Sequence, residues 1–403
     1  MLQLVPNLQR LGTETAFEVL ARAAELQRQG KDVINLGIGQ PDFQTPPHIV
    51  EAAIKALRDG HHGYTPAQGI LPLREAVAAD LKRRHGVDVA PDTIVIMPGG
   101  KPTMFSAILM FGQPGTDIMY PDPGFPIYRS MIQYTGARPV PIALLEKNEF
   151  AFTADQVLAQ ITPQTSLIIL NSPNNPCGGA VPAEEVKRLV IGLEKHPHVA
   201  VLSDEIYSQM LYGGRKHESF LRYPSLRDRL IVLDGWSKTY AMTGWRLGFS
   251  VWPQGLIEHV VRLCVNNHSC VNAPTQYAGI AALEGPQDAV GTMVAAFDER
   301  RRTIVPLLNQ LPGIRCLDPG GAFYVFPNVT GTGMTAKDLQ NLMLEKAGVA
   351  TVAAPVSAFT ARAIFASPTP IPWRTFARPC AGWRRCSGID FAWTCRSAIE
   401  PRS

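Results

Sequence analysis

Apolar runs of strand length alternate along the chain with helical segments, and this alternation constrains the fold more than any other feature. The runs are TIVIM (93–97), DIMY (117–120), SLIIL (166–170), HVAVLS (198–203), LIVLD (230–234) and LGFSVW (247–252). Because they carry few polar residues, they are typical of strands that are buried on both faces. We therefore predict an α/β fold with a mostly parallel sheet between two layers of helices.

The positions of these runs predict two structural units. We expect a large domain over residues 46–285, and a smaller α+β unit built from residues 1–45 and 286–352. The large domain is predicted to open with a helix that has Thr45 as its N-cap and stops at Gly60.

The net charge of +4 is unevenly distributed. Residues 353–403 contain seven arginines against one aspartate and one glutamate, which gives +5, so the first 352 residues sum to −1. This leaves no basic surface that would indicate nucleic-acid binding. There is no apolar stretch of membrane-spanning length and no secretory signal pattern at the start. Cysteines 177, 264, 270 and 316 form no regular framework, so we expect free thiols and a cytoplasmic protein.

Polar motifs follow four of the predicted strands. They are GGK (99–101), NSPNNP (171–176), DEIY (204–207) and GWSK (235–238). Ligands of open parallel sheets bind beyond the carboxyl ends of the strands, so these motifs are candidate site residues. Each has an ordinary alternative: a surface lysine, an aspartate N-cap, or Gly-Gly and Asn-Pro turns.

Two of the motifs suit a phosphate group. The backbone amides of Gly100 and Lys101, at the start of a predicted helix, would form an anion-binding cradle. Arg246, eight residues after Lys238, offers a planar set of donors that matches a phosphate dianion, although a surface ion pair is its alternative.

Taken together, the motifs resemble the class I and II aminotransferases, which depend on pyridoxal 5'-phosphate (PLP). The run SKTYAMTGWRLG (237–248) is similar to the family's cofactor-lysine signature nearly letter for letter, and NSPNNPCGG (171–179) to its N-x-P-x-N-P-T-G run. The resemblance covers about residues 10–352. It implies the fold of the fold type I PLP-transferases, with a seven-stranded sheet, and transfer of an amino group from an L-amino acid of aspartate-type or broader specificity to a 2-oxo acid.

The resemblance also implies residue roles. Lys238 would hold the cofactor and move the substrate α-proton, Asp204 would pair with the pyridine nitrogen, and Tyr207 would bond the ring oxygen. The other implied contacts are Asn175 to the ring oxygen and the substrate carboxylate, Gly39 to that carboxylate, Phe125 stacked on the ring, Gly100, Lys101, Ser237 and Arg246 at the cofactor, and Tyr64 at the phosphate of the neighbouring subunit of a homodimer.

The sequence leaves one alternative enzyme class open and disfavours another. A PLP-dependent β-lyase of the same fold would share these motifs. A dinucleotide-dependent oxidoreductase is disfavoured, because GIGQPD (37–42) lacks the third glycine and the strand-to-helix context of that fingerprint. His61 and His62 are adjacent and would point in different directions, so we predict surface histidines and no metal site.

Residues 353–403 depart from the family. We expect there neither its closing strand, which reads roughly LRFSYAN and carries the arginine that binds the substrate carboxylate, nor its final helix. If the reading frame is moved by two bases, ARAIFASPTPIPWRTFARPCAGW (361–383) can be read as EGYLRFSYANSVENIREALRR, with that arginine encoded across Phe365 and Ala366. We hypothesise that an insertion or deletion of one or two bases near codon 353 replaced the tail. A PLP-binding protein with impaired catalysis is therefore a further alternative.

Overall fold

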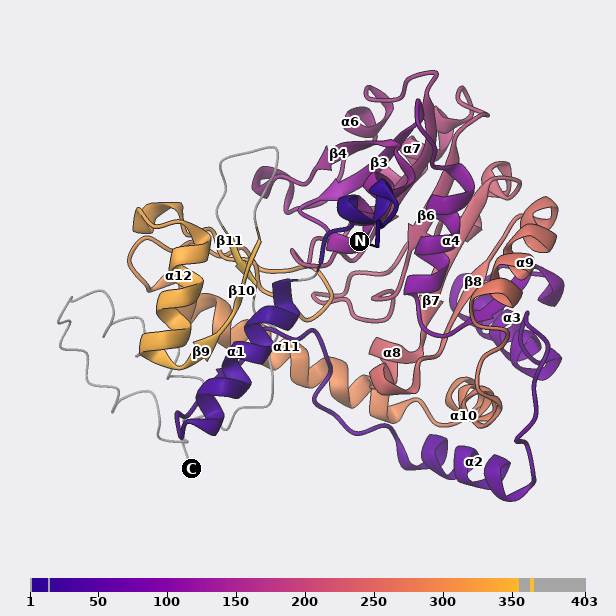
Figure 1. Ribbon diagram of the computed structural model, residues 1–403, viewed down its shortest axis with the longest axis horizontal. Coiled ribbons are helices and arrows are strands. Elements are labelled where there is room, and N and C mark those ends of the chain that lie inside the picture. The colour runs from indigo at the N-terminus through magenta and orange to yellow at the C-terminus, as the bar shows by residue number, and fades with distance from the viewer. Residues whose placement is uncertain (1, 14, 355–362, 366–403) are drawn as a thin grey trace.

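A seven-stranded sheet forms the centre of the protein. The structure is a computed structural model that describes residues 2–13, 15–354 and 363–365. The strands are β2 (Ile94–Met97), β3 (Asp117–Asp122), β4 (Arg138–Ala143), β5 (Thr165–Asn171), β6 (Ala200–Asp204), β7 (Leu230–Gly235) and β8 (Gly248–Val251). Their spatial order is β2-β8-β7-β6-β5-β3-β4, and β8 runs antiparallel to both of its neighbours. The predicted α/β fold with a mostly parallel sheet is confirmed (Figure 1).

Helices cover both faces of this sheet. One apolar cluster contains α2 (Pro47–Arg58), α3 (Leu71–His85), α7 (Ala183–Leu193) and α10 (Ala273–Glu284). The other contains α4 (Lys101–Phe111), α5 (Pro126–Thr135) and α9 (Ile257–Asn267). In β5, for example, Ile168 and Leu170 face the first cluster, while Leu167 and Ile169 face the second. Because both sides are buried, successive positions in the middle of the strand are apolar, and its polar residues lie at the ends.

A segment near each end of the chain, residues 34–35 and residues 349–350, meets the other beside the sheet domain (Figure 1). Strand β1 (Ile34–Asn35) pairs in parallel with β9 (Val349–Ala350), and α1 (Thr15–Arg28) contacts β9 and β10 (Val352–Ala354). Helices α11 (Asp288–Asn309) and α12 (Ala336–Leu342) belong to the same region, whereas the short α6 (Ala154–Leu158) and α8 (Trp236–Thr239) lie in the sheet domain. These contacts support our proposal that residues 1–45 and 286–352 form a small domain and residues 46–285 a large one.

Two sequence predictions of local structure are wrong. Thr45 does not cap α2: Pro46 is the N-cap residue, no side chain caps the helix, and the Thr45 hydroxyl donates to the carbonyl of Ala241 at 3.0 Å. A strand does occur in the atypical tail, since β11 (Ala363–Phe365) pairs antiparallel with β10. The rest of the proposed replaced tail, residues 355–362 and 366–403, lies outside the described residues.

The part of the chain that the structure describes has neither a membrane-spanning helix nor a metal-binding cluster. Within it, no helix is long and apolar enough to cross a membrane, and no cluster of His, Cys, Asp and Glu could hold a metal ion.

Candidate active site

The carboxyl ends of β5, β6 and β7 bring the predicted motifs to one edge of the sheet. Asn171 at the end of β5 lies opposite Asp204 at the end of β6, and the Asn171 amide donates to the Asp204 carbonyl at 3.0 Å. Strand β7 ends at Gly235, where α8 with Lys238 begins. Three motifs that are far apart in the sequence therefore meet, as parallel strand ends require.

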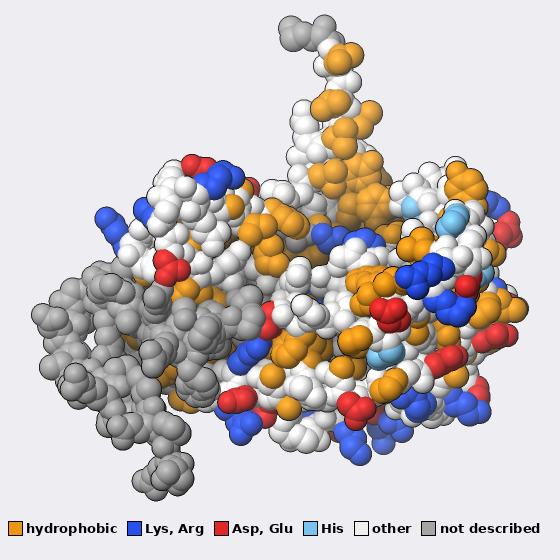
Figure 2. Space-filling view, turned by 90° about the horizontal axis from the view of Figure 1, so that it is seen from below, with side chains coloured by type: hydrophobic (Ala, Val, Ile, Leu, Met, Phe, Trp, Pro, Cys, Tyr) orange, Lys and Arg blue, Asp and Glu red, His pale blue; other side chains and the backbone are white. Residues whose placement is uncertain are grey.

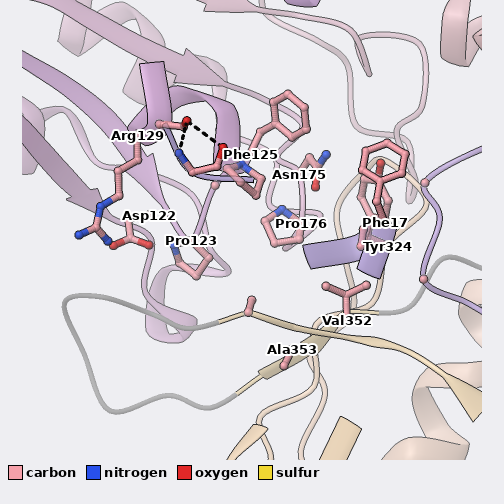
Figure 3. A pocket seen from close by; sticks show the side chains of 18 of the residues that line it. Phe17, Asp122, Pro123, Phe125, Arg129, Asn175, Pro176, Tyr324, Val352 and Ala353 are labelled. Carbon is pink, nitrogen blue, oxygen red and sulfur yellow. Dashed lines mark hydrogen bonds between the residues drawn. The ribbon is translucent and has the colours of Figure 1, made fainter. Parts of the chain in front are cut away.

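A cavity of about 450 Å³ lies at this edge of the sheet. Five of the predicted site residues line it: Gly39, Lys101, Phe125, Asn175 and Lys238. Figure 3 shows Phe125, Asn175 and Pro176 on one side, with Phe17, Tyr324, Val352 and Ala353 across from them. The cavity is therefore enclosed jointly by the large domain, the N-terminal segment and β10.

Lys238 extends its amine toward the N-terminal segment. Its Nζ donates to the carbonyl oxygen of Gly39 at 2.5 Å, which links α8 to a loop 199 residues earlier. The amine also lies 5.6 Å from the ring centre of Phe323 and 6.0 Å from that of Tyr207. The lysine is thus directed into the cavity among aromatic rings, and not toward solvent.

Asp204 is a buried carboxylate beneath the cavity. Tyr128 donates its hydroxyl proton to Oδ2 at 2.6 Å, and the backbone amide of Ile206 donates to Oδ1 at 3.2 Å. Burial raises the pKa of Asp204 to about 6, against the lowering effect of these two hydrogen bonds. Among the described residues, no Lys, Arg or His forms an ion pair with it, so the carboxylate is placed to receive a cation from a ligand.

Tyr207 and Asn175 follow the ends of β6 and β5. Tyr207 is buried, and its hydroxyl shares a hydrogen bond with that of Tyr324. Burial raises the pKa of Tyr207 well above its usual value, with a further rise caused by Tyr324, so the hydroxyl keeps its proton. The backbone amide of Asn175 donates to the Asn171 side chain at 2.9 Å, which fixes the loop that carries Asn175 into the cavity wall.

The glycine-rich turn before α4 packs against Arg246. A Cβ atom added to Gly99, which has a φ of +89°, would lie 2.3 Å from Nη2 of Arg246, so only glycine leaves room for the guanidinium. Arg246 is held by the carbonyl of Thr243 at 2.7 Å. Gly100 is the N-cap residue of α4, and Ser237 is buried in the first turn of α8. The helix N-terminus at Gly100 and the guanidinium of Arg246 are groups that could hold an anion.

A buried network of ion pairs connects the end of β7 to helix α3. Arg84 in α3 donates to Asp80 at 2.6 Å, to Asp234 at 3.1 Å and to the hydroxyl of Ser208 at 3.1 Å. Asp234 also accepts from the backbone amide of Gly235 at 2.7 Å. The strand end that leads to Lys238 is therefore fixed by charge as well as by packing.

Tyr64 is not part of the cavity in this chain. Its side chain is 95% exposed, and it is not among the described residues that line the cavity. Its predicted role depends on a second subunit, so the single chain leaves it a prediction. His61 is partly buried and stacks on Tyr277 with the ring centres 4.1 Å apart, whereas His62 is exposed as predicted and contacts the carbonyl of Leu57 at 2.8 Å.

The sequence interpretation missed three polar residues of the site. Tyr128 bonds Asp204, Tyr324 bonds Tyr207, and Arg129 adds a cation to the cavity wall. Tyr128 and Arg129 lie in PGFPIYR, three and four residues after Phe125, which is helical spacing and could have drawn attention to them. Tyr324 comes from an irregular segment, GGAFYVFP, where no periodicity marks it.

Comparison with known proteins decides the family. The family model for aminotransferase class I and II matches residues 31–367. The chain belongs to this family. It is 37% identical to the aspartate aminotransferase of Geobacillus stearothermophilus over 87% of its own length and 91% of that protein's. It is also 37% identical to an aromatic-amino-acid aminotransferase of Thermococcus litoralis, over 81% and 84% of the two chains.

The fold agrees with this family. The structure matches a crystal structure of the aspartate aminotransferase from Rhizobium meliloti with a TM-score of 0.90 and 32% identity, covering 96% of this chain and 99% of that one. The chain is therefore a PLP-dependent aminotransferase with the architecture of fold type I enzymes.

The residues at the site fit PLP. The cofactor has an aldehyde, an aromatic ring with a basic nitrogen, and a phosphate, and its enzymes supply a lysine and an acidic partner for the ring nitrogen. Here Lys238 lines the cavity, and Asp204 is a buried carboxylate that lacks a cationic partner among the described residues. The helix N-terminus at Gly100 and the guanidinium of Arg246 suit the phosphate.

Proposed function

We propose that this aminotransferase uses Lys238 as its cofactor-binding and proton-transferring residue. The observation that carries the proposal is the Lys238 amine inside the cavity, together with the buried Asp204 at the end of the neighbouring strand, which has no cationic partner among the described residues. The remaining roles that we propose are Asp204 at the pyridine nitrogen, Tyr207 and Asn175 at the ring oxygen, Phe125 against the ring, Gly100, Lys101, Ser237 and Arg246 around the phosphate, and Gly39 and Asn175 at the substrate carboxylate.

These residues divide the work of amino transfer. When bound, PLP supplies an electron-withdrawing ring that stabilises negative charge at the substrate α-carbon. Asp204 favours the protonated ring nitrogen, because a carboxylate in a buried site strongly prefers a cationic neighbour. The Lys238 Nζ, already directed into the cavity, would move a proton between the substrate α-carbon and the carbon of the cofactor aldehyde. Gly39, whose carbonyl accepts from Lys238, keeps the substrate carboxylate close to that amine.

We propose aspartate-type and aromatic amino acids as donors. The cavity wall carries two cationic side chains, Lys101 and Arg129, which suit a second carboxylate. Much of the remaining lining is apolar, with Phe17, Ile38 and Val352 among it, which suits an aromatic side chain. The names of the two relatives, an aspartate and an aromatic-amino-acid aminotransferase, support both classes.

The test is a visible absorbance spectrum of the purified chain with PLP, followed by a donor panel. We expect a band that Lys238→Ala abolishes, and L-aspartate or L-phenylalanine should discharge it and yield the matching 2-oxo acid. Release of ammonia and pyruvate, without amino transfer, would favour the β-lyase. A band that no donor discharges would favour the cofactor-binding protein with impaired catalysis.

The tail can be tested in the same assay. None of Arg362, Arg374 and Arg378 corresponds to the family's carboxylate-binding arginine, and all three lie outside the described residues. Replacing residues 362–382 by EGYLRFSYANSVENIREALRR should lower the donor KM, since a bidentate charge pair is worth about 2–5 kcal/mol in binding. An unchanged KM would count against the replaced-tail hypothesis, as would a DNA sequence without the shifted frame.

We also propose that the chain is a cytoplasmic homodimer in which Tyr64 reaches the partner's phosphate site. Tyr64 is 95% exposed, and hydrophobic side chains extend along the projecting N-terminal segment in Figure 2, where Leu2, Leu4 and Val5 are exposed. Exposed apolar patches of this kind commonly mark interfaces. Mixing inactive Lys238→Ala and weakened Tyr64→Phe subunits should restore activity, because one site of each hybrid is intact. No restoration in a verified hybrid would refute a shared site, and cell fractionation tests the compartment.

A further inference from the structure

Tyr324 forms the least expected contact of the site. Its side chain is buried, its hydroxyl shares a hydrogen bond with that of Tyr207, and the two ring centres are 5.6 Å apart with an interplanar angle of 77°. Both residues belong to one aromatic cluster with Phe323 and Phe297. None of the roles proposed above uses Tyr324.

Tyr324 also touches the main chain that holds Lys238. A Cβ atom on Gly39 would lie 2.5 Å from the Tyr324 hydroxyl oxygen, so that oxygen lies directly against the Gly39 Cα. The Gly39 carbonyl in turn accepts from Lys238 at 2.5 Å. Lys238, Gly39, Tyr324 and Tyr207 are therefore in continuous contact, and Tyr324 and Lys238 both line the cavity.

The number of protons decides how this pair works. A tyrosine hydroxyl has one proton to donate. If Tyr207 donates that proton to the ring oxygen of the cofactor, it cannot also donate to Tyr324, so Tyr324 must be the donor of the shared bond. A hydroxyl that accepts a hydrogen bond becomes a stronger donor, because the two bonds polarise each other.

We propose that Tyr324 is a positioning residue that donates to Tyr207 and thereby commits the Tyr207 hydroxyl to donate toward the cofactor. The proposal deepens the proposed function, since it rests on the roles given there to Lys238 and Tyr207. Gly39 is required for this arrangement, because any side chain at that position would displace the Tyr324 hydroxyl.

The consequence is a change in the protonation of Lys238. A strong hydrogen bond to the ring oxygen withdraws negative charge from it, so a proton on the nearby Lys238 nitrogen is held less tightly. Among the described residues, the other polar groups around Tyr207 are Asp204 and Tyr128, besides Tyr324 and the Lys238 amine. Because the Tyr324 hydroxyl also lies against Gly39, the acceptor of Lys238, an effect through Tyr207 must be separated from one through Gly39, which a Tyr207→Phe background does.

Tyr324→Phe is the test, and Tyr212→Phe is the matched control. Tyr212 is buried in the same aromatic cluster and its hydroxyl donates to the carbonyl of Ala322, but it is not among the described residues that line the cavity. Each chain is loaded with PLP, its melting temperature is recorded to verify folding, and its visible absorbance is followed as a function of pH.

In Tyr324→Phe, we expect the midpoint of the absorbance titration to rise by about half a unit to one unit, which is the effect of one neutral hydrogen bond. Tyr212→Phe should keep the midpoint of the unmodified chain. An unchanged midpoint in Tyr324→Phe, or an equal shift in both variants, would overturn the proposal.

A double-mutant cycle provides a second test. Because Tyr324 acts through Tyr207, adding Tyr324→Phe to a Tyr207→Phe chain should move the midpoint no further, and additive shifts would contradict the mechanism. A missing band in the unmodified chain would overturn both this proposal and the assignment of Lys238. A band that no donor discharges would refute the donor classes alone, since the Tyr324 shift is read from the spectrum and not from turnover.

Discussion

Replacement of Asp204 by asparagine should stabilise the cofactor-free chain while weakening cofactor binding. Asp204 is buried, accepts hydrogen bonds from Tyr128 and the Ile206 amide, and has no cationic partner among the described residues. Asparagine has nearly the same shape and can keep one acceptor bond, but it carries no charge. The substitution therefore separates the cost of a buried charge from the benefit of that charge to PLP.

The size of the effect follows from the pKa. Burial raises the pKa of Asp204 from its usual 3.8 to about 6, and each unit corresponds to about 1.4 kcal/mol. Ionised Asp204 thus costs the folded chain about 3 kcal/mol above pH 6. This cost already includes the charge-assisted bond from Tyr128, which lowers the pKa, and asparagine removes the cost. The net gain is about 3 kcal/mol, or a few degrees in melting temperature.

The pH dependence gives a second signature. The folded chain binds the Asp204 proton more tightly than the unfolded chain. The contribution of Asp204 to the free energy of unfolding therefore falls as the pH rises from about 4 to 6 and then levels off. The stability gain of Asp204→Asn should therefore be full at pH 7 and vanish below about pH 4.

The assay is thermal melting of both cofactor-free chains at several pH values, together with PLP titration at pH 7. The Kd for PLP should rise by roughly 10- to 100-fold, because the ring nitrogen loses its ion pair. A lower melting temperature for Asp204→Asn at pH 7, or a stability difference that persists at pH 4, would refute the reasoning about the buried charge.

Two further substitutions test the supports of the site. Arg84→Met leaves buried Asp234 without a cationic partner among the described residues, while Asp80 keeps Arg83, and should cost about 3–5 kcal/mol in urea unfolding. Arg188→Met, which breaks two ion pairs of an exposed arginine, should cost at most about 1 kcal/mol; equal losses would contradict the role of burial. Gly99→Ala should displace the guanidinium of Arg246 and raise the Kd for PLP roughly tenfold. Gly60→Ala, which has a similar φ but lies in open space, should leave the Kd unchanged. Similar Kd values in both variants would argue against a phosphate site at Gly99, Gly100 and Arg246.

The sheet was predictable where its strands are buried on both faces. Six of the seven strands were located by their apolar runs alone. Strand β4 (RPVPIA) was missed because Pro139 and Pro141 argue against a central strand. The strand is at the edge of the sheet, where prolines are tolerated since their missing amides can face away from a neighbour. The antiparallel direction of β8 has no local signal either, because a buried strand has the same composition in both directions.

The site was predictable where its residues follow strands in compact motifs. Asp204 ends β6, and Asn175 and Lys238 follow within four residues of the ends of β5 and β7, so their meeting at one edge follows from the parallel topology. Tyr324 could not be found in this way, because its contact with Tyr207 joins positions 117 residues apart through an irregular segment. Thr45 shows the opposite error: a sequence suited to a helix cap was used for a tertiary bond to Ala241 instead.

The resemblance to the family ends near residue 353, and the structure shows what lies at that point. Strand β10 ends at Ala354, close to codon 353, where the sequence stops resembling the family, and residues 352–354 form part of the cavity wall. The family match nevertheless runs to residue 367, and β11 pairs with β10 over residues 363–365. Strand β11 thus ends at Phe365, and in the shifted frame the arginine codon would span the codons of Phe365 and Ala366. A strand at that position would bring an arginine from the shifted frame next to β10, so the proposed replacement removes a substrate contact while leaving the cofactor groups of the sheet domain in place.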